Sequence, residues 1–343
     1  MSVRLRVLTA GPGVTLQNGG RWGWLRYGVT AAGPMDPLAF ATANLAVEGT
    51  RNAAAIEVSL GGIELSVEGG ELSVAVAGGA FRLTYAGREF ATPAMVRLIP
   101  HAALAIRAGP DGAWCYVAVA GRFDVPATLG SISTHVRSGI GGLQGRALAP
   151  GDVLTVSSPQ NLEPEIATIA APWLVRGDGP MRVVLGPQDD YFSADQIARF
   201  LQGPWTLSSR SDRMAYILDG TPLVHSKGFN IVSDGIAMGA IQVPGNGIPV
   251  VLMADRQPTG GYPKIATVVG VDLGRLAQRR AGEQLSFQAV DVDEAVSLRR
   301  GEAAVLAAPI KREALIRTEL SSEFLLATNL VGGVSSGDET ASE

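Results

Sequence analysis

Short apolar segments recur from residue 53 to residue 156, and each ends at glycine, proline or aspartate. A spacing of roughly ten residues with turn residues between the segments is typical of an antiparallel barrel or sandwich. An earlier segment alternates apolar and polar residues before Gly11-Pro12-Gly13 and predicts a first strand. The strands predicted in this half of the chain are 3–8, 55–60, 63–67, 72–77, 95–99, 103–108, 114–120 and 153–157.

A second cycle of apolar segments begins at residue 181 and predicts strands at 181–185, 248–254 and 265–271. Four helix starts interrupt the strands. Asp36-Pro37 combines a good N-cap with a proline suited to the first turn, and places Leu38, Ala41 and Leu45 on one face. The other predicted starts are capping boxes at Ser193 and Gln196 and at Asp291 and Glu294, and an Asp272 cap before a helix at 273–280.

These patterns predict a mainly β protein with a few helices, built as two units in tandem. The predicted units are an N-terminal domain at 1–160, an inter-domain crossing at 161–180 and a C-terminal domain at 181–290. The tail at 291–343 is predicted to be helical and then disordered, because its end is small, polar and acidic. The sequence shows no repeat strong enough to prove duplication.

The composition of the 343 residues narrows the classes of partner. Hydrophobic residues make up 46% and charged residues 17%, which is ample material for a core. A net charge of −4 without a basic cluster argues against nucleic acid and anionic membrane surfaces. The single cysteine, Cys115, excludes an intrachain disulfide and is predicted to be a buried thiol. Neither a signal peptide nor a membrane span is evident, so we expect a cytoplasmic protein.

Several common catalytic sites are absent from the sequence. The three histidines, His101, His135 and His225, lack metal-ligand spacing, and neither HExxH, CxxC nor an EF-hand occurs, so no metal is expected. A serine-hydrolase elbow is also missing. His225 is the one histidine we consider for catalysis, although a loop or cap role is favoured. Gly139 to Gly142 superficially resembles a phosphate cradle, but lacks the following helix and the P-loop lysine, so a glycine-rich hairpin or ligand-facing loop is preferred.

The stretch 208–264 carries the densest mixture of polar residues and buried-strand pattern. Buried polar groups are costly unless partnered, and loops held by a rigid sheet commonly carry binding chemistry. Asp212-Arg213 and Asp255-Arg256 pair opposite charges in adjacent positions, which face opposite ways in a strand. Ordinary surface ion pairs are the alternative for these two pairs. Further polar side chains at strand ends are Gln188, Gln242, Gln257, Tyr262 and Lys264.

The residues resemble a known family at many collinear blocks from about residue 3 to 290. These blocks include TLQNGGRWGWLRYGVTAAGPMDPLAFATANLAV, LGSISTHVRSGIGGLQGRALAPGD, LGPQDDYF, SSRSDRMAY and SDGIAMGAIQVPGNGIPVVLMADRQPTGGYPKIATV. The chain resembles the carboxyltransferase subdomain C/D family, which includes allophanate hydrolase subunit 2, the KipA-type antagonist, the C subunit of 5-oxoprolinase and the carboxyltransferase part of urea carboxylase. The resemblance implies two cyclophilin-like β-barrel domains with the site in the cleft between them.

One family motif departs from its usual form. Where the family reads Asp-Leu-Gly-Arg-Pro-Gly, this chain has Asn18-Gly19-Gly20-Arg21-Trp22-Gly23. No catalytic role is therefore carried over to Asn18. Arg21 and Asp36 keep the pattern, and the resemblance implies that they line the cleft.

The resemblance implies a subunit of an ATP-dependent 5-oxoprolinase, which opens 5-oxo-L-proline with ATP and water to L-glutamate. The expected partners are a smaller cyclophilin-like subunit (KipI or allophanate hydrolase subunit 1 type) and a third subunit of the LamB/YcsF type. One alternative is carboxyl transfer from carboxybiotin, on a separate carrier, to urea or a related amide. Another is a KipA-type antagonist that binds a kinase inhibitor. The chain alone is expected to bind no cofactor, and ATP is used by the complex.

The hypothesis assigns roles to eleven residues. Arg213 and Lys264 would hold a carboxylate or developing negative charge, because arginine offers a bidentate grip and lysine a compact charge. Asp212 or Asp255 would transfer protons, and the amide and tyrosine side chains would orient the substrate. The assigned catalytic residues are Asp212, Arg213, Asp255 and Lys264, and the assigned substrate-binding residues are Arg21, Asp36, Gln188, Gln242, Gly245, Gln257 and Tyr262.

Overall fold

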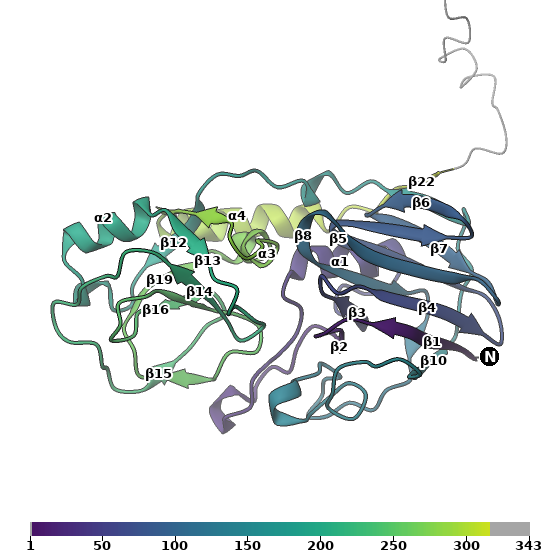
Figure 1. Ribbon diagram of the computed structural model, residues 1–343, viewed down its shortest axis with the longest axis horizontal. Coiled ribbons are helices and arrows are strands. Elements are labelled where there is room, and N and C mark those ends of the chain that lie inside the picture. The colour runs from purple at the N-terminus through teal and green to yellow at the C-terminus, as the bar shows by residue number, and fades with distance from the viewer. Residues whose placement is uncertain (1, 316–343) are drawn as a thin grey trace, which may run out of the picture.

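The computed structural model describes residues 2–315 and contains two large β-sheets, one in each half of the chain (Figure 1). Helix accounts for 17% and strand for 37% of the chain, and the larger sheet is nearly closed like a barrel, so the predicted mainly β class is confirmed. The strands of the first sheet are β1 (Ser2–Ala10), β2 (Thr15–Gln17), β3 (Ala55–Val58), β4 (Ile63–Glu68), β5 (Leu72–Tyr85), β6 (Arg88–Ala91), β7 (Ala94–Leu98), β8 (Ala103–Val119), β9 (Arg122–Phe123), β10 (Val153–Ser157), β11 (Ile166–Ile169) and β22 (Arg312–Ala314).

Two long strands, β5 and β8, form the spine of the first sheet. The N-terminal part of β8 pairs with β4 and its C-terminal part with β3, while β5 pairs along both parts. The register shifts twice near Ala80, and a Cβ at Gly109 would lie 1.7 Å from the Ala80 carbonyl oxygen. The two strands predicted at 103–108 and 114–120 are thus one bent strand. The prediction was wrong because glycines that permit close backbone approach were interpreted as a turn.

The second sheet runs in the order β20-β13-β14-β17-β16-β19-β12-β21, and only the β12–β21 pair is parallel. A separate two-stranded sheet joins β15 (Asp234–Gly235) to β18 (Thr259–Gly260). The strands of the second sheet are β12 (Met181–Leu185), β13 (Trp205–Leu207), β14 (Ala215–Asp219), β16 (Ala240–Gln242), β17 (Val250–Leu252), β19 (Lys264–Val268), β20 (Gln284–Leu285) and β21 (Phe287–Ala289).

The helix starts follow the predicted caps with one exception. The side chains of Asp36, Ser193 and Asp291 accept hydrogen bonds at the starts of α1 (Pro37–Ala46), α2 (Ala194–Gln202) and α4 (Val292–Val305). Asp272 makes no such cap for α3 (Leu273–Ala277) and instead pairs with Arg182 and Arg275. The chain also contains short 3-10 turns, η1 (Leu25–Tyr27), η2 (Val136–Ser138), η3 (Pro172–Leu174), η4 (Asp189–Tyr191) and η5 (Gly270–Asp272).

Helix α1 is buried on more sides than its predicted amphipathic face suggests. Leu38 and Leu45, which define that face, are only half-buried, whereas Ala39, Phe40 and Ala43 are buried against β5 and β8. The helix lies between the first sheet and α3. A helix that contacts neighbours on several sides does not need a single apolar stripe.

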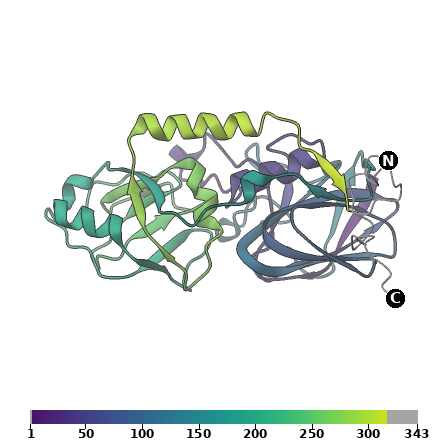
Figure 2. The same ribbon diagram turned by 90° about the horizontal axis from the view of Figure 1, so that it is seen from above.

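The C-terminal part of the described chain returns to the first sheet. Figure 2 shows α4 running along the top of both halves before β22 reaches the first sheet. Strand β22 pairs with β11, which lies inside the range predicted as an inter-domain crossing. The domain boundaries stay predictions. The predicted disorder of the tail falls on residues 316–343 and lies outside the described residues.

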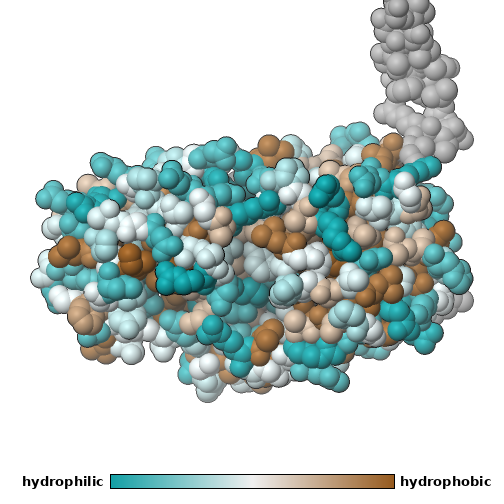
Figure 3. Space-filling view, in the orientation of Figure 1, coloured by the Kyte–Doolittle hydropathy of each residue, from teal (hydrophilic) through white to brown (hydrophobic). Residues whose placement is uncertain are grey.

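Each sheet encloses its own hydrophobic core, and the two halves are also packed together. Met35, from the first half, is fully buried in the core of the second sheet, and Trp114 packs against the same core. The Trp114 indole N–H donates to the Tyr216 hydroxyl at 3.1 Å. On the face in Figure 3, hydrophobic residues are scattered in small groups between polar ones. Side chains of the first half therefore pack directly against the core of the second half at the junction.

Candidate functional site

The guanidinium of Arg213 joins the two halves of the molecule. It donates from Nε and Nη2 to the two oxygens of Asp255, each at 2.9 Å, and from Nη1 to Glu57. Arg213 precedes β14 and Asp255 follows β17, whereas Glu57 lies on β3 of the first sheet. A further bond runs from Nη2 to the Gly33 carbonyl at 2.8 Å. One buried arginine thus holds carboxylates from both sheets, and we call Glu57, Arg213 and Asp255 the Arg213 cluster.

Glu57 is fully buried, and its carboxylate has three donors. Oε2 accepts from the Met35 N–H at 2.8 Å and from the Tyr116 hydroxyl at 2.9 Å, while Oε1 accepts from Arg213. Burial raises the pKa of Glu57, and the charge of Arg213 opposes that shift. Burial by itself would lower the pKa of Arg213, but Asp255 and Glu57 raise it above its ordinary value. The raised pKa of Glu57 favours a neutral carboxyl group, whereas the raised pKa of Arg213 favours a charged guanidinium. We assign an ionised Glu57–Arg213 pair, because three donors stabilise the carboxylate and Arg213 stays protonated.

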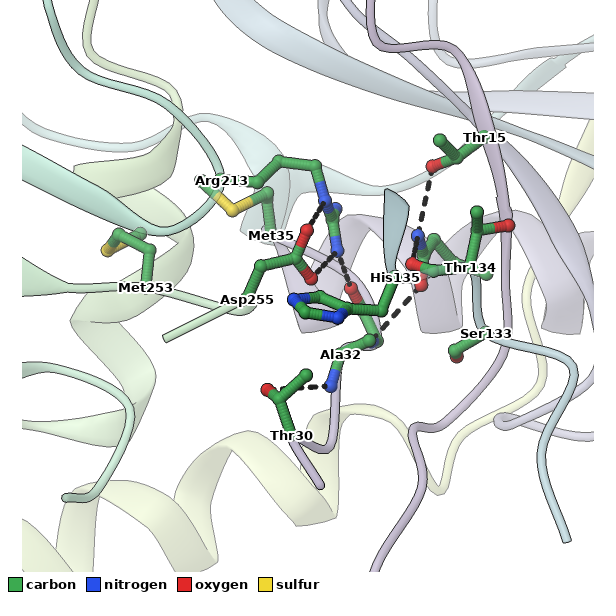
Figure 4. A network of polar contacts seen from close by, with 12 residues as sticks. Thr15, Thr30, Ala32, Met35, Ser133, Thr134, His135, Arg213, Met253 and Asp255 are labelled. Atoms are coloured by element: carbon green, nitrogen blue, oxygen red, sulfur yellow. Dashed lines mark hydrogen bonds and ion pairs between the residues drawn. The ribbon is translucent and has the colours of Figure 1, made fainter. Parts of the chain in front are cut away.

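A loop of the first half packs against the Arg213 cluster, as Figure 4 shows. The Gln17 amide accepts from the Gly33 N–H at 3.1 Å and donates to the Thr134 carbonyl at 3.1 Å. Gly33 in turn presents its carbonyl to Arg213. Buried polar contacts therefore fix the position of the guanidinium.

His135 lies beside Asp255 at the same junction (Figure 4). It is only 7% exposed, its Nδ1 is 2.9 Å from the Ser138 hydroxyl, and its Nε2 is buried without a hydrogen-bond partner. Burial lowers the pKa of His135, although the nearby Asp255 acts in the opposite direction. The imidazole is therefore neutral at pH 7.

A second group of predicted residues meets on the second sheet. Lys264, on β19, donates from Nζ to the Asp234 carboxylate at 2.6 Å, and its backbone N–H donates to the Gln188 amide oxygen at 3.1 Å. Gln242 is the cross-strand neighbour of Lys264 on β16, and its amide N–H donates to the Tyr262 carbonyl at 3.4 Å. Residues opposite one another in a sheet share a face. We call Lys264, Asp234, Gln188 and Gln242 the Lys264 cluster.

Arg256 contacts the segment that follows β15. Its Nε donates to the Ile236 carbonyl at 3.0 Å. The preceding carbonyl, that of Gly235, accepts from Lys264 Nζ at 3.3 Å. Within residues 2–315 Arg256 forms no ion pair, although it is only 3% exposed. Burial lowers the pKa of Arg256 to about 10, so the guanidinium is still charged at pH 7.

Asp212 and Arg213 divide between surface and interior as predicted, but the prediction was wrong for Asp255 and Arg256, which are both largely buried; neither pair lies within a strand. Asp212 is exposed and pairs with Arg137, while its neighbour Arg213 is buried at the junction. Asp255 faces Arg213, while its neighbour Arg256 faces Ile236. Asp255 of the Arg213 cluster and Arg256 thus lie next to each other on the loop after β17.

Two other predicted residues hold the framework of the first half. Arg21 is fully buried and donates to the carbonyls of Thr128, Ser131 and Ser133. The Asp36 carboxylate caps α1 and also accepts from Arg176 and Gln278, both at 2.8 Å. Neither side chain contacts the Arg213 or the Lys264 cluster.

The remaining predicted residues are dispersed along the second half. Gly245 packs under the ring of Phe229, and the Gln257 amide oxygen is buried without a partner. Tyr262 contributes its backbone carbonyl and exposes its side chain. The His225 ring lies tilted against Phe192, and its Nε2 contacts the Val243 carbonyl at 3.0 Å, which fits the loop role favoured for it.

Two grooves lie along the junction. One of about 270 Å³ is lined by Asp36, Arg176 and Gln278, and another of about 370 Å³ is lined by Asp212, Trp114 and Tyr216. Neither groove contains Asp255 or Lys264 in its lining. We therefore place the candidate chemistry at the two ion clusters rather than in these grooves.

Across residues 2–315, no set of three histidine, cysteine, aspartate or glutamate side chains is grouped as a metal site would require. Cys115 is buried, as predicted, and burial raises the pKa of its thiol. No helix in the described part of the chain is both long and apolar enough to cross a membrane.

A family model described as the carboxyltransferase domain, subdomain A and B, matches residues 27–289. The chain belongs to this carboxyltransferase family. The family predicted from the sequence is thereby confirmed, and the subdomains that match are A and B rather than C and D.

Two bacterial relatives match this carboxyltransferase chain over nearly their whole length. The Escherichia coli protein, named as the C subunit of 5-oxoprolinase, is 36% identical over 311 residues, which cover 87% of this chain and 95% of the relative. The Haemophilus influenzae protein of the same name is 36% identical over 83% of this chain and 91% of its own. The crystal structure of the K. lactis urea amidolyase aligns with a TM-score of 0.82 and 27% identity over 93% of this chain, but only 20% of its own.

Sequence reasoning missed Glu57 of the Arg213 cluster, the adjacent His135, and Asp234 of the Lys264 cluster. Glu57 reads as part of a strand, and His135 as part of a glycine-rich loop. Asp234 and Arg256 lie within the stretch 208–264, but nothing in the spacing pairs Asp234 with Lys264. An acidic residue inside an apolar strand such as AAIEVSL was the one available signal for Glu57, because unpaired buried carboxylates are rare.

Proposed function

We propose that this chain is the C subunit of an ATP-dependent 5-oxoprolinase, which converts 5-oxo-L-proline, ATP and water to L-glutamate. The observation that carries the proposal is the 36% identity over 95% of the Escherichia coli relative of that name. A lactam is a poor electrophile, and its hydrolysis is therefore coupled to ATP. The chain would act in the cytoplasm with a smaller cyclophilin-like subunit and a third subunit of the LamB/YcsF type.

The two ion clusters support distinct roles in this reaction. Lys264 would hold the substrate carboxylate or developing negative charge, with Gln188 and Gln242 orienting the amide. Asp255 would take part in proton transfer, and Arg213 keeps its carboxylate in one orientation through two hydrogen bonds. His135 lies beside Asp255 with its imidazole neutral, which suits it to accept a proton. The predicted contributions of Arg21, Asp36, Asp212, Gly245, Gln257 and Tyr262 stay proposals.

Carboxyl transfer is the second candidate function, and the TM-score of 0.82 to the urea amidolyase favours it. In that reaction biotin would arrive on a carrier belonging to another chain, and Lys264 would face the transferred carboxyl group. The KipA-type antagonist function stays a prediction.

The test is reconstitution of the complex from this chain, the small cyclophilin-like subunit and the LamB/YcsF-type subunit. We expect ATP hydrolysis and glutamate formation that depend on 5-oxoproline and stop when this chain is left out. A parallel assay supplies urea with a carboxylated biotin carrier. Carboxybiotin consumption without 5-oxoproline turnover would replace the proposal with carboxyl transfer, and a tight complex inactive in both assays would favour the antagonist function.

A further inference from the structure

Gln17 ends strand β2 and lies on the face of the first sheet that carries Glu57. Strand β2 pairs with β3 so that Gln17 lies opposite Ala55, and Thr15 lies opposite Glu57. Alternate residues of a strand share a face, and so do residues opposite one another in a sheet. Gln17 is fully buried. Its amide therefore points to the same side of the sheet as the carboxylate that binds Arg213.

The Gln17 amide forms hydrogen bonds at both of its ends. Its Oε1 accepts from the Gly33 N–H at 3.1 Å, whereas its Nε2 donates to the Thr134 carbonyl at 3.1 Å and to the Thr15 hydroxyl at 2.9 Å. All three partners belong to buried residues. A flipped amide would set its oxygen against the Thr134 carbonyl and its nitrogen against the Gly33 N–H, so these contacts allow one orientation.

The two ends of the amide lead to two different neighbours of Asp255. Gly33 presents its carbonyl to Arg213 Nη2 at 2.8 Å, and the same nitrogen donates to Asp255 Oδ1 at 2.9 Å. The Thr134 carbonyl belongs to the peptide bond that joins Thr134 to His135, whose ring lies beside Asp255 (Figure 4). One buried side chain thus connects the guanidinium and the imidazole at a single carboxylate.

The backbone on either side of the amide needs such support. Gly33 has a φ of 92°, and glycine readily adopts other conformations, so a hydrogen bond to its N–H restricts the direction of its carbonyl. Thr134 lies in a loop, and it donates from its N–H and from its hydroxyl to the Leu16 carbonyl, each at 2.9 Å. Strand β2 therefore supports the segment that enters His135, and Gln17 extends that support to Gly33.

We infer that Gln17 is a positioning residue that holds the His135 imidazole and the Arg213 guanidinium in a fixed relative position. It acts through two backbone groups, the Gly33 N–H and the Thr134 carbonyl. Loss of the amide displaces the imidazole and the guanidinium relative to each other while both side chains remain. The positioning follows from contacts within this chain, whereas its consequence for proton transfer rests on the proposed function.

The test follows the three histidine rings of the full chain by NMR after selective ¹⁵N labelling. The His135 signals are those that are missing from the His135→Gln spectrum. Gln17→Met keeps the reach of the side chain and removes both ends of the amide, so we expect the His135 signals to shift. The signals of His101 and His225 should not change.

A titration of the same signals gives the pKa of His135 in each variant. Burial lowers this pKa, whereas Asp255 raises it and the cations Arg213 and Arg21 lower it. A ring displaced toward water loses part of the largest of these contributions, so Gln17→Met should raise the pKa of His135 toward its ordinary value. A glutamine with a purely structural role would reduce stability and leave this pKa unchanged.

The matched control is Asn44→Leu. Asn44 is 1% exposed, and its amide donates to the Ala53 carbonyl at 3.0 Å, between α1 and the loop that follows it. This variant also removes a buried amide hydrogen bond from the first half. We expect a lower denaturant midpoint in both variants and a change at His135 in Gln17→Met alone. The same change in Asn44→Leu, or none in Gln17→Met, would overturn the inference.

Thr15→Val covers the case in which Gln17→Met does not fold. It removes one of the three partners of the Gln17 amide and keeps the shape of the threonine side chain. We expect a smaller shift of the His135 signals in the same direction. If Gln17→Met does not fold, unchanged His135 signals in Thr15→Val would count against the inference.

Activity of the reconstituted complex separates this inference from the proposed function. Because Gln17 acts through other groups, we expect Gln17→Met to lower kcat for 5-oxoproline-dependent ATP hydrolysis roughly tenfold to a hundredfold with little change in KM, as for a small misplacement of reacting groups. A change at His135 without a loss of kcat would support the positioning and count against a role of His135 in the reaction. A change at His135 in a chain whose complex never turns over 5-oxoproline would support the positioning and count against the proposed function.

Discussion

The Arg213 cluster and the Lys264 cluster use the same residue types in opposite ways. In the Arg213 cluster one cation meets two carboxylates, and Glu57 has donors for both of its oxygens. In the Lys264 cluster one buried cation, Lys264, pairs with one carboxylate, Asp234, whose side chain is 53% exposed. The first cluster is buried and holds two surfaces together, whereas the second has a carboxylate that faces solvent.

The clusters also differ in what they connect. The Arg213 cluster joins β3 of the first sheet to the loops around β14 and β17 of the second. The Lys264 cluster belongs to the second half alone. We therefore expect substitutions of Glu57 and Arg213 to act mainly on stability and those in the Lys264 cluster mainly on activity.

The largest expected effect is on folding stability and comes from Arg213→Ala. Removing one partner of a buried ion pair leaves the others uncompensated and costs about 3–5 kcal/mol of the free energy of unfolding. Denaturant midpoints measured by fluorescence would show the loss. Arg137→Ala is the control, because Arg137 and its partner Asp212 are both exposed and such pairs contribute about 0–1 kcal/mol. Equal midpoint shifts in the two variants would remove the distinction between the clusters.

Lys264→Met should abolish most activity while the protein stays folded. The substitution keeps the apolar stem and removes the charge, so we expect a loss of roughly 10²–10³-fold in 5-oxoproline-dependent ATP hydrolysis by the complex, as for other electrostatic groups at reacting centres. Lys227→Met, at an exposed lysine that also pairs with an aspartate, should retain activity. A fully active Lys264→Met complex would contradict the assignment of Lys264.

His135 should make stability depend on pH. Because burial lowers its pKa in the folded protein, the unfolded chain binds a proton first as the pH falls through about 6.5, and stability decreases there. Asp255, Arg213 and Arg21 influence the same ring. We expect His135→Gln to reduce the difference between denaturant midpoints at pH 7.5 and pH 5.5. His101→Asn, at an exposed position, is the control, and an unchanged difference in His135→Gln would refute the prediction.

The smallest effect is expected at Asp212. Its carboxylate accepts from the backbone N–H groups of Met214 and Ala215 and pairs with exposed Arg137. Asp212→Asn keeps an acceptor for the turn, so we expect a change within about 1 kcal/mol in stability and little loss of activity. Steady-state kinetics of the complex would check this, and a loss comparable to that of Lys264→Met would restore Asp212 as a catalytic candidate.

Much of the local structure could be read from the sequence because its causes are local. Asp36, Ser193 and Asp291 cap their helices as predicted, since a cap needs only the next few residues. Asp212 and Arg213 also separate into an exposed and a buried side chain, although they lie in the turn before β14 and not in a strand. The prediction of two strands in place of β8 was wrong because the glycines there permit an approach to β5, a partner distant in sequence.

The order of residues was enough to predict the mainly β class, the family and the region that carries Lys264 and Asp255. It did not predict which charges meet, because that depends on the packed fold. Glu57 reaches Arg213 across 156 positions of the chain, and Asp234 reaches Lys264 across 30. Such pairings depend on how the sheets pack and on which side chains are removed from water, and neither property is encoded in the spacing of residues along the chain.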